Sequence, residues 1–298
     1  MSAAAMDVSL WSLLIGPLTE FGFMRRALVG CLALSLSCAP VGVFLLLRRM
    51  SLTGDAMAHA VLPGAAIGYL IAGLSLPAMT FGGVVAGLLV AVGSGLVARS
   101  TVLREDASLA AFYLISLALG VLIVSTRGSN VDLLHVLFGT VLALDNGALA
   151  LLVGTAIVTL LALALLYRPL VLECVDPQFL RSVSRLSPVA HYGFLCLLVI
   201  NLVAGFHALG TLMAVGMMVL PAAAARLWVR SLPALMALAT GLALAASVTG
   251  LLLSYHVEWP TSPAIVLCLG AAYLASLVLG RNGLWRGGAR SARRHLQR

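Results

Sequence analysis

The chain has 298 residues, of which 62% are hydrophobic and 9% charged, and its mean hydropathy is +1.11. A soluble domain is roughly 45–50% apolar and about 25% charged, so a water-soluble fold of this length has too little interior to bury this composition. The formal net charge of +8 comes from 18 arginines and 10 acids, and the chain has no lysine. Without lysine there is no phosphate-binding loop of the G-x-x-x-x-G-K-[ST] type, and the scattered arginines favour a membrane surface over nucleic acid.

Three regions are predicted from the distribution of apolar residues. Residues 1–25 are predicted to form an interfacial lead-in rather than a signal peptide, because Arg25 and Arg26 follow the first apolar stretch. Residues 26–280 form the predicted transmembrane domain. Residues 281–298 are predicted to be a basic cytoplasmic tail that meets anionic lipid headgroups.

The transmembrane domain is divided into apolar runs, and a membrane-spanning helix needs about 20 apolar residues. Candidate spans lie at 27–47, 57–74, 78–98, 107–125, 147–167, 189–205, 208–224, 234–254 and 262–280. A further stretch at 133–144 is too short to cross and is predicted to be interfacial or re-entrant. Because 189–224 is nearly continuous, we expect an all-α polytopic membrane bundle of eight or nine transmembrane helices.

Arginines mark one side of this bundle, and loops rich in arginine stay in the cytoplasm. With nine spans, that side carries Arg48, Arg49, Arg99, Arg104, Arg168, Arg181, Arg185, Arg226, Arg230 and the arginines of the tail. The loops of the other side carry only Arg127, although Arg25 and Arg26 also fall there. We therefore expect a multi-pass protein of the plasma membrane, with its N-terminus outside and its C-terminus inside.

Residues 48–64 hold the most informative pattern, R-R-M-S-L-T-G-D-A-M-A-H-A-V-L-P-G. Asp55 and His59 are four residues apart and therefore share a helix face. A carboxylate beside an imidazole suits a divalent transition metal, and ionisable groups in a span are functional candidates. An alternative is that Asp55 caps the helix and pairs with Arg48 or Arg49, while His59 bonds a neighbouring helix. Two residues alone do not complete a transition-metal site.

This run resembles the signature of the bacterial zinc, manganese and iron ABC-importer permeases. Further motifs follow in that family's order across residues 38–280: Glu105-Asp106, Val131-Asp132-Leu133, Leu137-Phe138-Gly139, Asp176-Pro177, Gly210-Thr211-Leu212, Pro221 to Arg226, and Pro260 with Pro263. The resemblance implies a pore subunit that is not itself an enzyme, carries a divalent metal ion as cargo and binds no permanent cofactor. Asp55 and His59 would then face the translocation path.

The resemblance also implies partners: a cytoplasmic ABC ATPase, an extracytoplasmic metal-binding solute receptor, and a second permease copy, either as a homodimer, which we expect, or as a pair of different permeases. The segment from Pro221 to Arg230 is predicted to dock into the ATPase. Pro221 is expected to start a short helix there, with Arg226 and Arg230 on one face.

Histidines outside the first motif are weaker candidates. His207, His256 and Glu258 fall in predicted outer loops, where they would pass metal from the receptor into the pore, or would simply be solvated. His135, beside Asp132, is open to the same two interpretations.

Methionine side chains are candidate copper ligands, because thioethers suit Cu(I). Met213, Met217 and Met218 have helical spacing, but methionine is an ordinary filler of apolar cores, and we interpret them as core. The five cysteines form no C-x-x-C pair and are interpreted in the same way.

Four positions depart from the family pattern and leave the preferred metal open: Ala110, Thr140, Ser184 and Ser262. A permease for iron chelates or cobalamin is the main rival, and its bulky cargo would need no direct ligands from the chain. A secondary metal transporter is a second rival, although such proteins usually place acids in mid-span. An intramembrane hydrolase has no support, since neither H-E-x-x-H nor G-x-S-x-G occurs.

Overall fold

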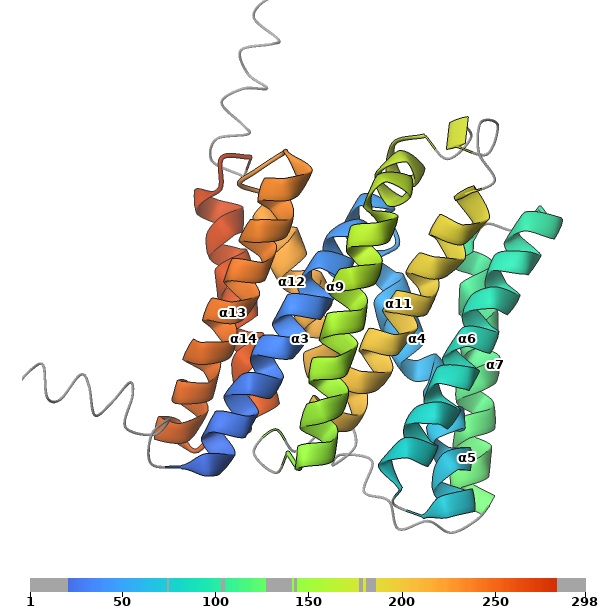
Figure 1. Ribbon diagram of the computed structural model, residues 1–298, viewed down its shortest axis with the longest axis horizontal. Coiled ribbons are helices and arrows are strands. Elements are labelled where there is room, and N and C mark those ends of the chain that lie inside the picture. Colours follow the sequence, from blue (N-terminus) through green and yellow to red (C-terminus); the bar gives the residue numbers. More distant parts are fainter. Residues whose placement is uncertain are drawn as a thin grey trace, which may run out of the picture.

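The computed structural model describes residues 21–73, 75–102, 105–126, 141, 144–176, 179–180 and 186–282. Its helices are α3 (Gly22–Leu47), α4 (Ser51–Ala60), α5 (Leu62–Ala72), α6 (Leu76–Ser100), α7 (Glu105–Thr126), α9 (Asn146–Val175), α11 (Leu186–Leu209), α12 (Thr211–Arg226), α13 (Leu232–Val257) and α14 (Thr261–Leu279). These described ranges contain no strand, and the helices stand together as one bundle, which confirms the predicted all-α class (Figure 1).

Eight spans in the described part of the chain are long and apolar enough to cross a membrane. α4 and α5 together make one of them, Ser51–Ala72, whereas α12 is apolar but has only 16 residues. Gly210 separates α11 from α12 with a backbone φ of 94°, a conformation that favours glycine, and so divides the nearly continuous run 189–224. The prediction of eight or nine transmembrane helices is confirmed.

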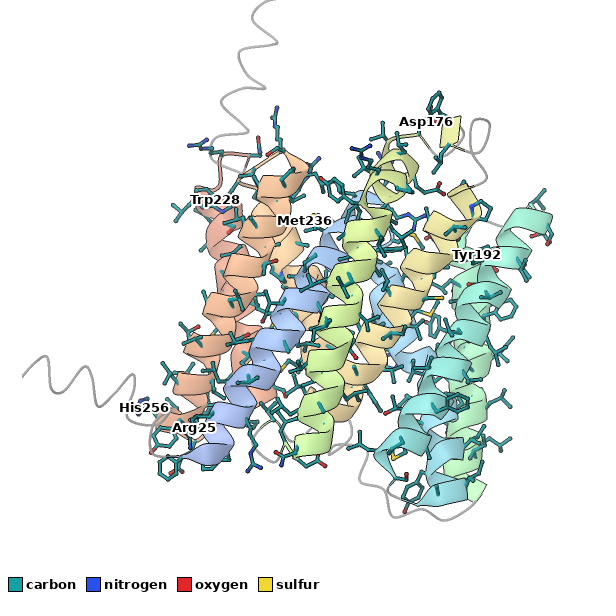
Figure 2. The ribbon with its side chains drawn as sticks, in the orientation of Figure 1. Arg25, Asp176, Tyr192, Trp228, Met236 and His256 are labelled. Carbon is teal, nitrogen blue, oxygen red and sulfur yellow. The ribbon has the colours of Figure 1, made fainter. Side chains whose placement is uncertain are left out.

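The ends of the helices fall on two opposite ends of the bundle. The start of α3 lies beside the end of α13, where the rings of Phe21 and Tyr255 are 6.0 Å apart. The end of α14 lies instead beside the turn after α12, because the backbone N–H of Asn282 donates to the carbonyl of Leu227 at 2.9 Å. Figure 2 shows the same division, with Arg25 and His256 at one end and Trp228 at the other.

α3 is the central helix, and it packs against α9, α12 and α13 (Figure 1). Most of its side chains from Met24 to Leu45 are buried. Gly42 allows the closest approach, since a Cβ atom at this position would overlap the carbonyl oxygen of Met218 on α12. Small residues are the usual means by which membrane helices bring their backbones together.

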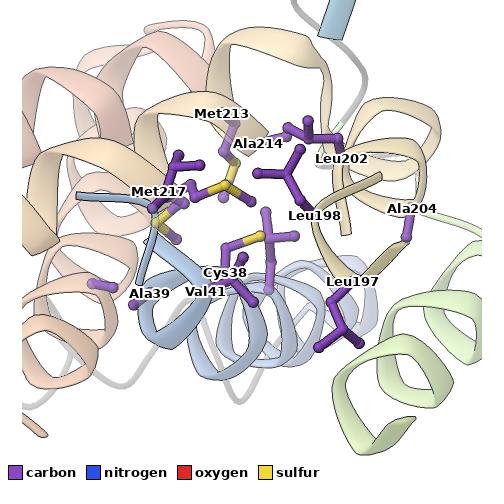
Figure 3. Close-up of a cluster of buried hydrophobic side chains, with 14 of the residues drawn as sticks. Cys38, Ala39, Val41, Leu197, Leu198, Leu202, Ala204, Met213, Ala214 and Met217 are labelled. Carbon is purple, nitrogen blue, oxygen red and sulfur yellow. The ribbon is translucent and has the colours of Figure 1, made fainter. Parts of the chain in front are cut away.

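Sulfur side chains fill the core between α3, α11 and α12. Figure 3 shows Cys38, Met213 and Met217 among apolar neighbours, and all three are fully buried. Met218 is buried as well, and all five cysteines are free. The interpretation of the three methionines as core residues is confirmed.

A sharp turn joins α3 to α4 and sets where α4 starts. Arg49 adopts a left-handed conformation with φ of 59°, and the N–H of Met50 donates to the carbonyl of Leu45 at 3.0 Å. The N–H of Arg49 donates to Leu46 at 3.1 Å, which completes the helix-ending Schellman arrangement. Glycine usually occupies such a position, because other residues lose about 1–2 kcal/mol there. The chain therefore reverses at once, and α4 begins at Ser51 against the end of α3.

Replacing Gly42 with alanine is expected to lower the stability of the bundle by about 1–3 kcal/mol or more, because the added methyl group forces α12 away from α3. The thermal unfolding midpoint of the purified protein measures this loss. Gly241→Ala on α13 is the matched control, since a Cβ atom there meets nothing within 4 Å. Equal midpoints for the two variants would contradict the close packing of α3 on α12.

Candidate functional site

Asp55 and His59 lie next to each other on α4, as their spacing predicted. The carboxylate Oδ1 of Asp55 is 3.9 Å from Nε2 of His59, and the side chains are 67% and 36% exposed. Leu52, one turn earlier on the same face, is 83% exposed. The opposite face of α4, which carries Thr53, Met57 and Ala60, is buried against the bundle. α4 therefore presents an open face that carries a carboxylate and an imidazole.

The alternative role for Asp55 as a helix cap is wrong. The N-cap residue of α4 is Met50, and Asp55 is the fifth residue of the helix. Arg48, one of the two arginines considered as its partner, bonds to residues of α9 and α11 instead. The carboxylate and imidazole thus both lie within α4 and not at its cap.

The described part of the chain supplies too few ligands for a complete metal site. Among the residues that the structure describes, no three side chains of His, Cys, Asp and Glu are grouped so that they would hold an ion. A transition metal in a protein usually takes four or more ligands. Asp55 and His59 would therefore need water or further protein groups to complete a coordination shell.

A buried polar cluster at the end of α3 was missed by the sequence analysis. Nη2 of Arg48 is 3.6 Å from Oε1 of Glu173 on α9, and the two side chains are 7% and 3% exposed. The same Nη2 lies 2.9 Å from Nδ1 of His191 on α11. Because an arginine only donates, Nδ1 of His191 accepts this bond. The hydroxyl of Ser187 donates to Oε2 of Glu173 at 3.0 Å.

This cluster joins three helices directly before the turn into α4. The guanidinium of Arg48 also lies 5.0 Å from the ring centroid of Phe194, a cation–π distance. The sequence analysis did not predict this cluster because the fifth predicted span ended at residue 167, before Arg168 and Pro169. The helix continues to Val175 with Pro169 inside it, and so buries Glu173.

The proposed outer residues lie at the end of the bundle where α13 stops. His256 is in the last turn of α13 (Figure 2), and Glu258 follows in a left-handed conformation with φ of 58°. Both residues are exposed. The backbone of His207 lies in the last turn of α11, and its side chain is outside the described set. The hydroxyl of Ser262 donates to the carbonyl of Leu209 at 2.8 Å, so α14 begins beside that turn.

The predicted local structure of the docking segment is wrong in two respects. Pro221 does not start a helix, because it lies buried inside α12. α12 ends at Arg226, so Arg230 cannot share a helix face with it. The two exposed arginines instead flank a turn that contains Trp228, and Nη2 of Arg230 donates to Oδ1 of Asn282 at 3.1 Å.

Known proteins resemble this chain over nearly its whole length. The model of the family described as "ABC 3 transport family" matches residues 20–280. This chain belongs to that family. The manganese import system permease protein ScaB of Streptococcus parasanguinis is 33% identical over 89% of this chain and 93% of its own length. The chelated iron transport system membrane protein YfeD of Yersinia pestis is 31% identical over 90% and 89%.

Solved structures agree with the family assignment. The structure of PsaBC from Streptococcus pneumoniae in complex with Fab has a TM-score of 0.78 and 30% sequence identity, over 90% of this chain and 95% of that one. An inward-facing structure of a putative metal-chelate type ABC transporter has a TM-score of 0.65 at 18% identity, which shows the shared fold. The resemblance to the metal ABC-importer permeases found in the sequence is confirmed.

Two of the four departures from the family pattern have a structural description. Ser262 is buried, and its hydroxyl makes the α14–α11 bond described above, which glycine could not make. Ala110 lies half-buried in the second turn of α7. Thr140 and Ser184 lie outside the described residues, as do Asp132 and His135.

Removing one partner of the Arg48–Glu173 pair should cost about 3–5 kcal/mol, because the other charge stays buried without its counterion. We expect Glu173→Ala to lower the thermal unfolding midpoint strongly and Glu173→Gln to lower it less, since the amide oxygen still accepts from Arg48. Arg168→Ala on the exposed face of α9 is the control. Wild-type stability in Glu173→Ala would show that the cluster does not hold the three helices together.

Proposed function

We propose that this chain is the membrane-spanning permease subunit of an ABC importer for divalent transition metal ions. The observation that carries the proposal is the open face of α4, where Asp55 and His59 lie 3.9 Å apart in a membrane span of a member of the ABC 3 transport family. Charged groups at such depth are costly and mark substrate paths. The metal is the cargo, and we propose no permanently bound cofactor.

Manganese or iron is the proposed cargo. The relatives named above are described as manganese import and chelated iron transport proteins, and they give no specific support to zinc. Carboxylate oxygen and imidazole nitrogen together suit Mn²⁺ and Fe²⁺. A permease for an intact iron chelate would need a wide path and no ligands from α4, so the effect of removing the Asp55 charge distinguishes the two cargoes.

The pore subunit would work with three partners. A separate cytoplasmic ATPase would supply the energy, since this chain has no lysine for a phosphate-binding loop and is proposed not to be an enzyme. An extracytoplasmic receptor would deliver metal near His207, His256 and Glu258. A second permease copy, forming a homodimer, would bring its own Asp55 and His59 and so raise the number of ligands to the usual four.

The orientation follows from charge. The end of the bundle with Arg48, Arg226 and Arg230 would face the cytoplasm, because arginine-rich loops stay inside. The N-terminus would then lie outside and the basic tail inside. Metal would enter at the end with His256, pass the open face of α4, and leave at the arginine-rich end as ATP-driven closure of the ATPases moves the helices.

Substitutions in the pair should abolish transport without unfolding the protein. Asp55→Asn keeps the shape and removes the charge, and His59→Ala removes the imidazole; each should lower manganese uptake under chelation by about 10- to 100-fold or more. Both side chains are partly exposed, so membrane insertion and ATPase binding should remain normal.

Asp145→Asn is the matched control, because this exposed carboxylate caps α9 and an amide oxygen still accepts from Ala148. It should transport normally. Normal uptake in a combined Asp55→Asn, His59→Ala variant would contradict the proposed metal path and direct attention to His207, His256 and Glu258.

The docking of the ATPase should depend on the turn after α12. Arg226 is exposed at the helix end and able to meet acidic groups, so Arg226→Glu should reduce co-purification of the ATPase several-fold. Arg168→Glu, a charge reversal on exposed α9, should leave the complex intact. If the Arg226→Glu complex is stable and transports normally, the docking surface lies elsewhere.

A further inference from the structure

The second span is interrupted directly after His59. α4 ends at Ala60 and α5 begins at Leu62, with Val61 between them. Pro63 is the cause, because proline has no amide hydrogen and cannot donate to the carbonyl four residues before it, which is that of His59. The candidate metal ligand is therefore the penultimate residue of a short helix that ends within the membrane.

Two residues of α7 contact the second span at this interruption. The hydroxyl of Ser116, which is 8% exposed, donates to the carbonyl of Ala60 at 2.9 Å. Gly120 lies one turn further along α7, and a Cβ atom on it would be 3.2 Å from both Cγ and N of Pro63. α7 thus contacts the span on both sides of the break, with a hydrogen bond before it and a close packing contact after it.

The far side of the break is held by backbone contact with α6. A Cβ atom on Gly64 would overlap the carbonyl oxygen of Gly82, so α5 and α6 lie directly against each other. α5, α6 and α7 form one side of the bundle in Figure 1. The position of His59 relative to these three helices depends on how Ala60, the next residue, is bonded to α7.

We propose that Ser116 is a positioning residue for the metal path: by holding the Ala60 carbonyl it sets the end of α4 and with it the direction of the His59 side chain. This inference rests on the proposed function of Asp55 and His59. A carbonyl buried away from water needs a donor, and the serine hydroxyl supplies one from a helix that belongs to a different part of the bundle.

Manganese uptake by the complete importer tests the proposal. Ser116→Ala should raise the apparent KM for manganese about tenfold, as losses of groups that orient metal ligands do, with the protein inserted and bound to its ATPase. Ser116→Thr keeps a hydroxyl and should recover most of the affinity. Ser276→Ala is the matched control, because the hydroxyl of that buried serine donates to the carbonyl of Ala272 on its own helix, α14.

A second pair of variants addresses the packing contact. Gly120→Ala should raise the KM in the same direction, since the methyl group presses on Pro63. Gly154→Ala on α9 should not, because nothing lies within 4 Å of its added carbon.

Combining Ser116→Ala with His59→Ala separates positioning from general stability. If Ser116 acts through His59, the double variant should transport no worse than His59→Ala alone. A wild-type KM in both Ser116→Ala and Gly120→Ala, with His59→Ala inactive, would overturn this inference and leave the proposed function standing. Normal uptake in His59→Ala would overturn both.

Discussion

Hydrocarbon supplies no hydrogen bonds, so every polar or charged group within the membrane must find its partner in the protein or in a water-filled path. The buried cluster meets part of this demand inside one chain, since Arg48 bonds Glu173 and His191, and Glu173 accepts from Ser187. The pair on α4 does not meet it in the same way. Asp55 and His59 lie 3.9 Å apart with side chains that are 67% and 36% exposed, so water, a metal ion or further protein groups would have to satisfy them.

The buried Arg48 cluster and the Asp55–His59 pair are linked through the backbone. Arg48 is the last residue before the left-handed Arg49, and α4 begins two residues later, so the buried cluster anchors one end of the helix that carries the site. Ser116 holds the other end through Ala60. A helix of ten residues, fixed at both ends and open on one face, is well suited to present two ligands that must bind a metal and then release it.

Much of this arrangement was predictable from hydropathy and spacing, because a 20-residue apolar run has few alternatives in lipid and residues four apart must share a helix face. The errors came from prolines and from contacts between distant helices. Pro169 and Pro221 lie inside helices, where neighbouring membrane helices tolerate them, rather than at a helix boundary. Glu173 and His191 gave no local signal, since their partner Arg48 is far away in sequence and only the fold brings them together.

The central claim is that the open face of α4 lines an aqueous path and not lipid. It is tested most directly by placing single cysteines at position 59 on α4 and at position 161 on α9, in a variant whose five native cysteines are replaced by alanine. Leu161 is 61% exposed on an apolar helix face, so a cysteine there reports on lipid. In the assembled importer, a water-soluble maleimide should label position 59 and leave position 161 unlabelled. Equal, negligible labelling at both positions would contradict the account.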